Sequence, residues 1–146
     1  MEIRIVGRDL TRELRRAVLR PSWPPESPMH GDENTDALHL AALADDGEVI
    51  GTCLILPRAF PPRPEVSRAW QLRGMATAPT WRGRGVGAAV LAAAVEQARR
   101  RAGELLWCDA RTTAVPFYRK HGFAAEGAEF LHAESGILHY RMWRMI

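Results

Sequence analysis

Residues 82–87 read Arg-Gly-Arg-Gly-Val-Gly and precede an alanine-rich run, residues 88–102, that favours a helix. Glycine lets the backbone approach an anion closely, and a helix N-terminus offers unpaired N–H groups and a partial positive charge. The two arginines add formal charge, and each charge-assisted hydrogen bond contributes about 1.5–3 kcal/mol. The pattern therefore predicts a site for a phosphate or pyrophosphate at the start of this helix.

Two nucleotide-binding motifs compete for this turn. A P-loop requires Lys and then Ser or Thr after its last glycine, and Ala88 and Ala89 stand there instead, which excludes it. The dinucleotide fingerprint G-x-G-x-x-A fits residues 83–88, and Asp109 ends the next expected strand. However, residues 78–82 separate the preceding strand from the first glycine, and one parallel crossover provides at most half of such a site. The dinucleotide interpretation stays open as an alternative.

The same turn resembles the acyl-CoA signature (Arg or Gln)-x-x-Gly-x-(Gly or Ala) of the GNAT acetyltransferase superfamily. Residues 114–123, Ala-Val-Pro-Phe-Tyr-Arg-Lys-His-Gly-Phe, are similar to that family's second signature, Ala-x-x-(Phe or Leu)-Tyr-x-x-x-Gly-Phe. The two motifs stand at the expected separation, and the resemblance covers essentially the whole chain. It is closest to small bacterial members, and it implies an N-acetyltransferase that moves an acetyl group from acetyl-CoA to a small-molecule or peptide amine.

The resemblance also implies where acetyl-CoA binds. The backbone N–H groups of the turn would hold the pyrophosphate, and the strand before it would bond the pantetheine arm like an added strand. A bulge in that strand would explain the isolated Gly74. The implied cosubstrate-binding residues are Met75, Ala76, Thr77, Arg82, Gly83, Arg84, Gly85, Val86 and Gly87, and no metal is implied.

Tyr118 occupies the general-acid position of the second signature. The ordinary pKa of a tyrosine is about 10 and that of a thiol about 8.5, so a tyrosine can donate a proton to a departing thiolate near neutral pH. The structural alternative is that Tyr118, next to Phe117, is a core aromatic whose hydroxyl finds a partner. The motif favours the proton donor.

No residue stands out as the general base. Asp109, Glu65, His132 and His139 are all candidates, although direct attack by a neutral amine, with water carrying the proton, needs none of them. Cys108 lies in an apolar run, and we expect it to be buried and inert rather than a nucleophile. We therefore expect direct transfer in a ternary complex.

One departure from the family pattern keeps another function class open. Three residues before the second signature the family carries an asparagine, and here Arg111 stands there, where it could reach a CoA phosphate or block the amine site. A noncatalytic acyl-CoA-binding or sensing module would keep the turn and lose the amine site. The sequence does not identify the amine.

The elements that position these residues follow from periodicity and turn signals. We expect a mixed α/β sheet of about seven strands, GNAT-type, with one central parallel crossover and flanking helices, in a single domain over residues 1–146. The expected strands are residues 2–6, 37–44, 49–56, 66–77, 104–109, 123–132 and 137–145, and the later helices are 86–102 and 113–121.

The first expected helix is capped by Asp9, ends at Pro21 and places Leu10, Leu14, Ala17 and Val18 on one apolar face. The segment that follows, up to Asp36, holds four prolines and should be an irregular surface excursion. Its acidic cluster, around His30, Asp32, Glu33 and Asp36, is either solvated or part of a wall that attracts a protonated amine.

Composition adds weaker limits. Hydrophobic residues make up 47% and charged residues 25% of the 146, which is typical of globular proteins. Cys53 and Cys108 lack metal-ligand spacing, which indicates buried thiols in a reducing compartment. The net charge of +3 favours an anionic partner only weakly, and the run at 99–101 complements a helix dipole better than it suits nucleic acid. We expect a cytoplasmic protein with no membrane contact, and a homodimer is compatible with the sequence.

Overall fold

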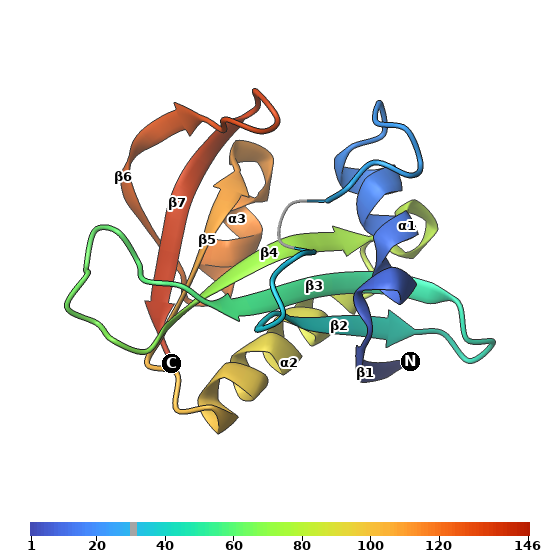
Figure 1. The fold of residues 1–146 in the computed structure, drawn as a ribbon, viewed down its shortest axis with the longest axis horizontal. Helices are drawn as coiled ribbons and strands as arrows, with labels where there is room; N and C mark the ends of the chain where they lie inside the picture. The colour runs from blue at the N-terminus through green and yellow to red at the C-terminus, as the bar shows by residue number, and fades with distance from the viewer. Residues whose placement is uncertain (30–31) are drawn as a thin grey trace. The chain divides into compact units, whose positions relative to one another are not determined.

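Seven strands and three α-helices form in the described part of the chain, which a computed structural model gives as residues 1–29 and 32–146 (Figure 1). The helices are α1 (Arg8–Leu19), α2 (Val86–Arg100) and α3 (Val115–Lys120), with short 3-10 helices η1 (Pro79–Trp81) and η2 (Thr112–Ala114). The strands are β1 (Glu2–Val6), β2 (Leu38–Leu43), β3 (Val49–Pro57), β4 (Ala69–Thr77), β5 (Leu105–Arg111), β6 (Ala124–Leu131) and β7 (Leu138–Met145).

The strands form one sheet in the order β1-β2-β3-β4-β5-β7-β6. β4 and β5 run parallel, with a register from Ala69 opposite Leu105 to Gln71 opposite Trp107. The pairs β1–β2, β2–β3, β5–β7 and β6–β7 are antiparallel. The expected mixed sheet with one parallel crossover is confirmed.

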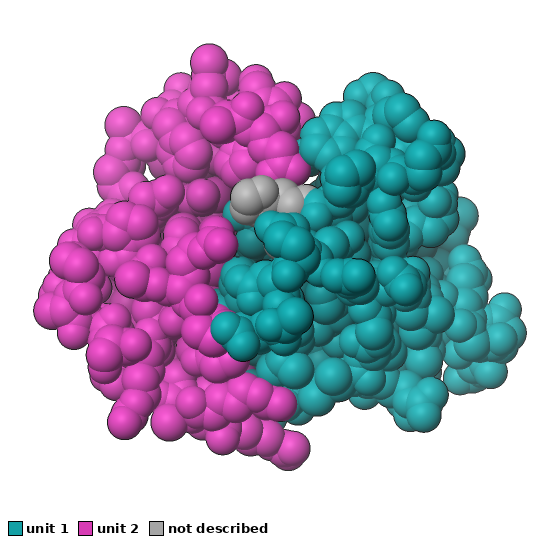
Figure 2. All heavy atoms as spheres, in the orientation of Figure 1, with its two compact units in different colours: residues 1–56, 72–97 teal, residues 57–71, 98–146 magenta. Residues whose placement is uncertain are grey.

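By its internal contacts the chain divides into two units, coloured separately in Figure 2. Unit 1 comprises residues 1–56 and 72–97, and unit 2 comprises residues 57–71 and 98–146. No helix in the described ranges has the length and apolar character needed to cross a membrane.

In unit 1, α2 packs tightly on the sheet because β3 carries a glycine beneath it. A Cβ added at Gly51 would lie 2.5 Å from Cγ1 of Val86 and 3.2 Å from Cγ2 of Val90, so a larger residue would push the helix outward. Val86, Val90 and Leu91 are each at most 2% exposed. The expectation that this nearly apolar helix packs closely against the sheet is confirmed.

The expected apolar face of α1 is wrong. Leu10 is 51% exposed, and the buried residues of the helix are Thr11 and Arg15. The expected cap is wrong as well, because Gly7 is the N-cap residue and Asp9 lies in the first turn. Burial of a guanidinium is tolerated only where charge and hydrogen-bond partners surround it.

Turns place most boundaries where glycine and proline predict them. The β2–β3 hairpin closes through Gly47, whose φ is +88°. Pro116 lies in the first turn of α3, as expected. β4 begins at Ala69 rather than Val66, because the N–H of Val66 bonds the carbonyl of Arg63 in a turn.

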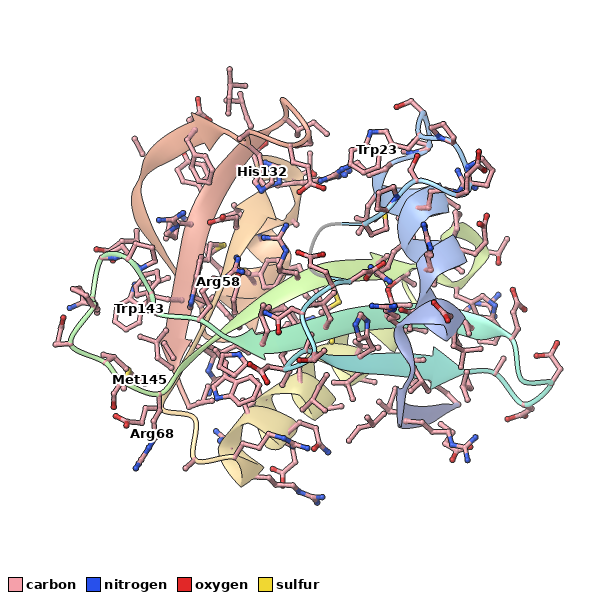
Figure 3. All side chains as sticks on the ribbon, viewed as in Figure 1. Trp23, Arg58, Arg68, His132, Trp143 and Met145 are labelled. Carbon is pink, nitrogen blue, oxygen red and sulfur yellow. The ribbon has the colours of Figure 1, made fainter. Side chains whose placement is uncertain are left out.

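Unit 2 has its own apolar centre under the loop that leads into β4. Phe60, Ala69, Leu105 and Trp107 form a buried cluster. Trp143 of β7 packs against it with its ring 5.8 Å from that of Phe60 (Figure 3). This cluster supports β5, which leads through η2 into α3, and β7, the neighbour of β5 in the sheet.

Candidate functional site

The glycine turn lies in unit 1 between η1 and α2. Gly83 and Gly85 have φ angles of +76° and +81°, a conformation that glycine adopts without strain. A Cβ added at either position would have no neighbour within 4 Å, so open space surrounds the turn. The N–H of Ala78 donates to the carbonyl of Ile50 at 2.8 Å, which fixes the segment between β4 and the turn to β3. α2 begins at this turn, and the first N–H groups of a helix have no partner within it, so they are available to an anion.

Both arginines of the turn are exposed, and one is held by an aromatic ring. The guanidinium carbon of Arg84 lies 4.9 Å from the ring centre of Trp81 in η1. A cation–π contact of this kind limits where the side chain points. The sequence analysis missed Trp81, although an aromatic residue directly before the first arginine was a usable signal.

The last three residues of β4, Met75 to Thr77, lead towards the turn through Ala78 and η1. Ala76 is 4% exposed, whereas Met75 and Thr77 are half-buried. Gly74 interrupts the strand with a φ of +61°, and the hydroxyl of Thr52 donates to its carbonyl at 3.0 Å. The expected irregularity at Gly74 is confirmed, and the close neighbour there is the side chain of Arg15, whose Cδ would lie 3.0 Å from an added Cβ.

Tyr118 belongs to unit 2, where α3 buries it to 5% exposure. Its ring makes edge-to-face contacts with Phe117 at 5.1 Å and Phe123 at 5.3 Å between ring centres. Burial, with a smaller contribution from the Asp109 charge, raises the pKa of the Cys108 thiol far above its usual range, and a hydrogen bond from Tyr118 opposes this rise. The expectation that Cys108 is buried is confirmed. Tyr118 as proton donor stays a prediction.

The candidate bases have different surroundings. Asp109 accepts a hydrogen bond from Nε of Arg141 at 3.0 Å and is 13% exposed, so its carboxylate is engaged in an ion pair. His139 is 5% exposed, and its ring lies 4.6 Å from that of His132. Glu65 is fully on the surface. This geometry singles out no base among them.

Arg111 ends β5, where the register places it opposite His139. Its effect on the amine site stays a prediction. Among the residues that the structure describes, no group of three or more His, Cys, Asp or Glu side chains could hold a metal ion.

Arginines of α1 bind the segment that follows the helix. Nη2 of Arg12 donates to the carbonyls of Glu26 at 2.8 Å and Ser27 at 2.6 Å. Nη1 of Arg16 donates to the carbonyl of Trp23, which lies beside the helix in Figure 3. We call residues 23–29 together with Asp32 the strap. It is irregular, as expected, but it is held to α1 rather than free in solvent.

The acidic cluster divides into two kinds of residue. Glu33 and Asp36 are exposed, which fits the solvated alternative. Asp32 is different, because its side chain is 13% exposed and pairs with Nη1 of Arg15 at 2.9 Å. His30, the remaining member of the predicted cluster, lies outside the described residues.

Comparisons with known proteins agree with this architecture. A sequence model described as the Acetyltransferase (GNAT) family matches residues 8–123. A Bacillus subtilis (strain 168) protein described as the uncharacterized N-acetyltransferase YitI is 26% identical over 130 residues, covering 89% of this chain and 87% of that protein.

Two solved structures show the shared fold. An IAA acetyltransferase from Bacillus cereus ATCC 14579 superposes with a TM-score of 0.76 at 18% identity, covering 99% of both chains. An aminoglycoside 6'-N-acetyltransferase complexed with coenzyme A superposes with a TM-score of 0.73 at 16% identity, covering 99% of this chain and 97% of that one. The family match, which spans both signatures and most of the sheet, identifies an acyltransferase: the chain belongs to the GNAT acetyltransferase family.

Proposed function

We propose that residues 1–146 form one catalytic domain that moves an acetyl group from acetyl-CoA to a primary amine by direct transfer in a ternary complex. The observation that carries this proposal is the open turn at the start of α2, with Gly83 and Gly85 both left-handed and unobstructed. The complex of a structural neighbour with coenzyme A supports an acyl-CoA as the ligand.

The turn fits a pyrophosphate in shape and charge. Its glycines leave room for phosphate oxygens against the backbone, and Arg82 and Arg84 are both exposed beside it. The strand residues before it can bond an extended amide-containing arm as a further strand would. The residues proposed to hold the cosubstrate are Met75, Ala76, Thr77, Arg82, Gly83, Arg84, Gly85, Val86 and Gly87.

The cosubstrate supplies the activated acetyl group as a thioester. In the proposed reaction the amine nitrogen forms a bond to the carbonyl carbon, the carbon–sulfur bond breaks, and the sulfur takes a proton. Tyr118 donates that proton: its ring is held by Phe117 and Phe123, and its hydroxyl hydrogen-bonds the Cys108 thiol, which burial keeps neutral. The amine loses its own proton to water, because no described carboxylate or histidine stands out as its acceptor.

We also propose a reducing, cytoplasmic setting, which the free and buried thiols Cys53 and Cys108 support.

The proposal is tested by calorimetric titration with coenzyme A, followed by thiol release from acetyl-CoA with polyamines, amino acids, aminoglycosides and peptides. Tyr118→Phe should lower kcat by about 100-fold or more, the usual contribution of a general acid, while the Kd for coenzyme A changes less than about twofold. Tyr140→Phe, which removes the hydroxyl of the only other tyrosine, is the matched control and should retain full activity.

Each failure has a separate meaning. Full activity of Tyr118→Phe would remove the proton-donor role alone. Binding of coenzyme A without reaction of any amine would favour a noncatalytic acyl-CoA-binding module. Absence of coenzyme A binding would overturn the proposal entirely.

A further inference from the structure

Arg15 is a buried arginine that the proposed reaction does not use. It is 1% exposed, and partners in three directions fix its guanidinium. Nε donates to the hydroxyl of Thr11 at 3.1 Å, Nη2 to the carbonyl of Arg8 at 3.3 Å, and Nη1 pairs with Asp32 at 2.9 Å. A guanidinium held at three points leaves its aliphatic stem little freedom.

That stem lies against the glycine of β4. Cδ of Arg15 would be 3.0 Å, and Cγ 3.8 Å, from a Cβ added at Gly74. The carbonyl of Gly74 is held separately by the hydroxyl of Thr52. Arg15 therefore covers the one left-handed residue of β4, directly before the strand residues that are proposed to bond the pantetheine arm.

The same side chain also holds the strap. Asp32 is fixed twice by α1, because its carboxylate pairs with Arg15 and its carbonyl accepts a hydrogen bond from Arg8. One arginine thus contacts both the backbone irregularity of β4 and the carboxyl-terminal residue of the strap.

We propose that Arg15 is a positioning residue that links the strap to Gly74, so that the placement of the strap and the binding of the CoA arm on β4 depend on each other. This inference rests on the proposed function. Such linkage is reciprocal: if loosening the strap weakens coenzyme A binding, coenzyme A binding must order the strap.

The first test is calorimetric titration of coenzyme A into four proteins: wild type, Arg15→Met, Asp32→Asn and Arg12→Met. Arg15→Met keeps most of the stem and removes the guanidinium, and Asp32→Asn keeps the shape and removes the charge. We expect the Kd to rise about tenfold for the first and about fivefold for the second, within the usual range of coupling between sites.

Arg12→Met is the matched control, because Arg12 holds the same strap through the carbonyls of Glu26 and Ser27, whereas the arginine nearest to Gly74 is Arg15. The Kd of Arg12→Met for coenzyme A should change less than about twofold if binding depends on the contact between Arg15 and Gly74 rather than on general loosening of the strap. An equal rise for Arg12→Met and Arg15→Met would overturn the inference. So would a wild-type Kd for both Arg15→Met and Asp32→Asn.

The second test measures hydrogen exchange of backbone amides with and without coenzyme A. Coenzyme A should slow exchange at Met75–Thr77 and also in the strap, and Arg15→Met should abolish the protection of the strap while some protection at the turn remains. Arg15→Lys replaces Arg15→Met if the latter does not fold, and should show a partial loss. Protection at the turn with none in the wild-type strap contradicts the inference and leaves the proposed function intact, whereas no protection anywhere contradicts the proposed function.

Discussion

Helices α1 and α2 cover opposite faces of the strands of unit 1, and they do so with opposite chemistry (Figure 1). Gly51 and Leu54 are three positions apart on β3, so they point to opposite faces. Gly51 meets the valines of α2, and Leu54 lies beside the site at Gly74 that Arg15 of α1 covers. One helix is held by apolar contact, whereas the other buries an arginine.

The difference shows what each kind of burial requires. An apolar helix needs only a matching apolar surface, so the burial of α2 can be predicted from its own composition. A buried arginine needs a partner, and for Arg15 that partner lies beyond the end of the helix, at Asp32. Its burial depends on how the strap folds back, which the helix sequence does not contain.

The largest effect should come from removing the buried cation. Arg15→Ala leaves the Asp32 carboxylate without its partner and uncovers Gly74. Breaking a buried pair costs about 3–5 kcal/mol, and the 13% exposure of Asp32 places the expected loss near the lower value. Urea unfolding measures it. The double variant Arg15→Met/Asp32→Asn should lose less free energy of unfolding than Arg15→Ala. If its loss equals the sum of the losses of Arg15→Met and Asp32→Asn, the pair does not act as a unit.

Overpacking the opposite face should have a smaller effect. Gly51→Val forces β3 and α2 apart at Val86 and Val90, at an expected cost of about 2 kcal/mol. Its midpoint in urea should fall without a change in the slope of the transition. A loss greater than that of Arg15→Ala would reverse the order of importance of the two helices.

A pH-dependent effect between pH 7 and 5 should come from the α1 face. Burial lowers the pKa of His39, with Arg15 and Arg8 acting in the same direction and Asp32 opposing them. As the pH falls, His39 of the unfolded chain therefore takes up its proton at a higher pH than His39 of the folded protein. The stability that depends on neutral His39 is complete above about pH 6.5 and falls as the pH drops below it, by at most about 1.4 kcal/mol per pH unit. His39→Gln should flatten that slope in urea titrations between pH 7 and 5. An unchanged slope would exclude His39 as its source.

The smallest effect should come from the ion pair of the same helix whose carboxylate, that of Glu13, is 71% exposed. Arg16 pairs with Glu13 at 2.7 Å, and this hydrogen bond lowers the pKa of Glu13. Exposed pairs contribute little, so Glu13→Gln should leave the thermal midpoint within about one degree. A shift as large as that of Arg15→Ala would show that burial of the carboxylate does not separate the two ion pairs.

The sequence predicted the parts of the molecule that depend on local signals. The turn chemistry around Gly47 predicted the β2–β3 hairpin, and the alanine-rich run predicted α2 and the crossover. The glycines of residues 82–87 predicted an exposed turn, because positive φ and missing side chains are properties of glycine itself.

The parts that depend on distant partners were not predictable in this way. Four apolar residues suggested the buried face of α1, yet the buried polar pair Thr11 and Arg15 defines it, because Asp32 supplies the compensating charge. The division of the acidic cluster into exposed and buried members has the same origin. Trp81 is an exception, because its partner Arg84 is only three residues away and the aromatic residue before Arg82 was a usable signal.

The strap has one property that follows from how it is held. Arg12 and Arg16 donate to main-chain carbonyls of Trp23, Glu26 and Ser27, and every amino acid possesses a carbonyl of this kind. Side chains in this stretch can therefore be exchanged without removing the hydrogen bonds that fasten it. That makes residues 23–27 a favourable place to introduce new side chains while the segment stays fastened to α1.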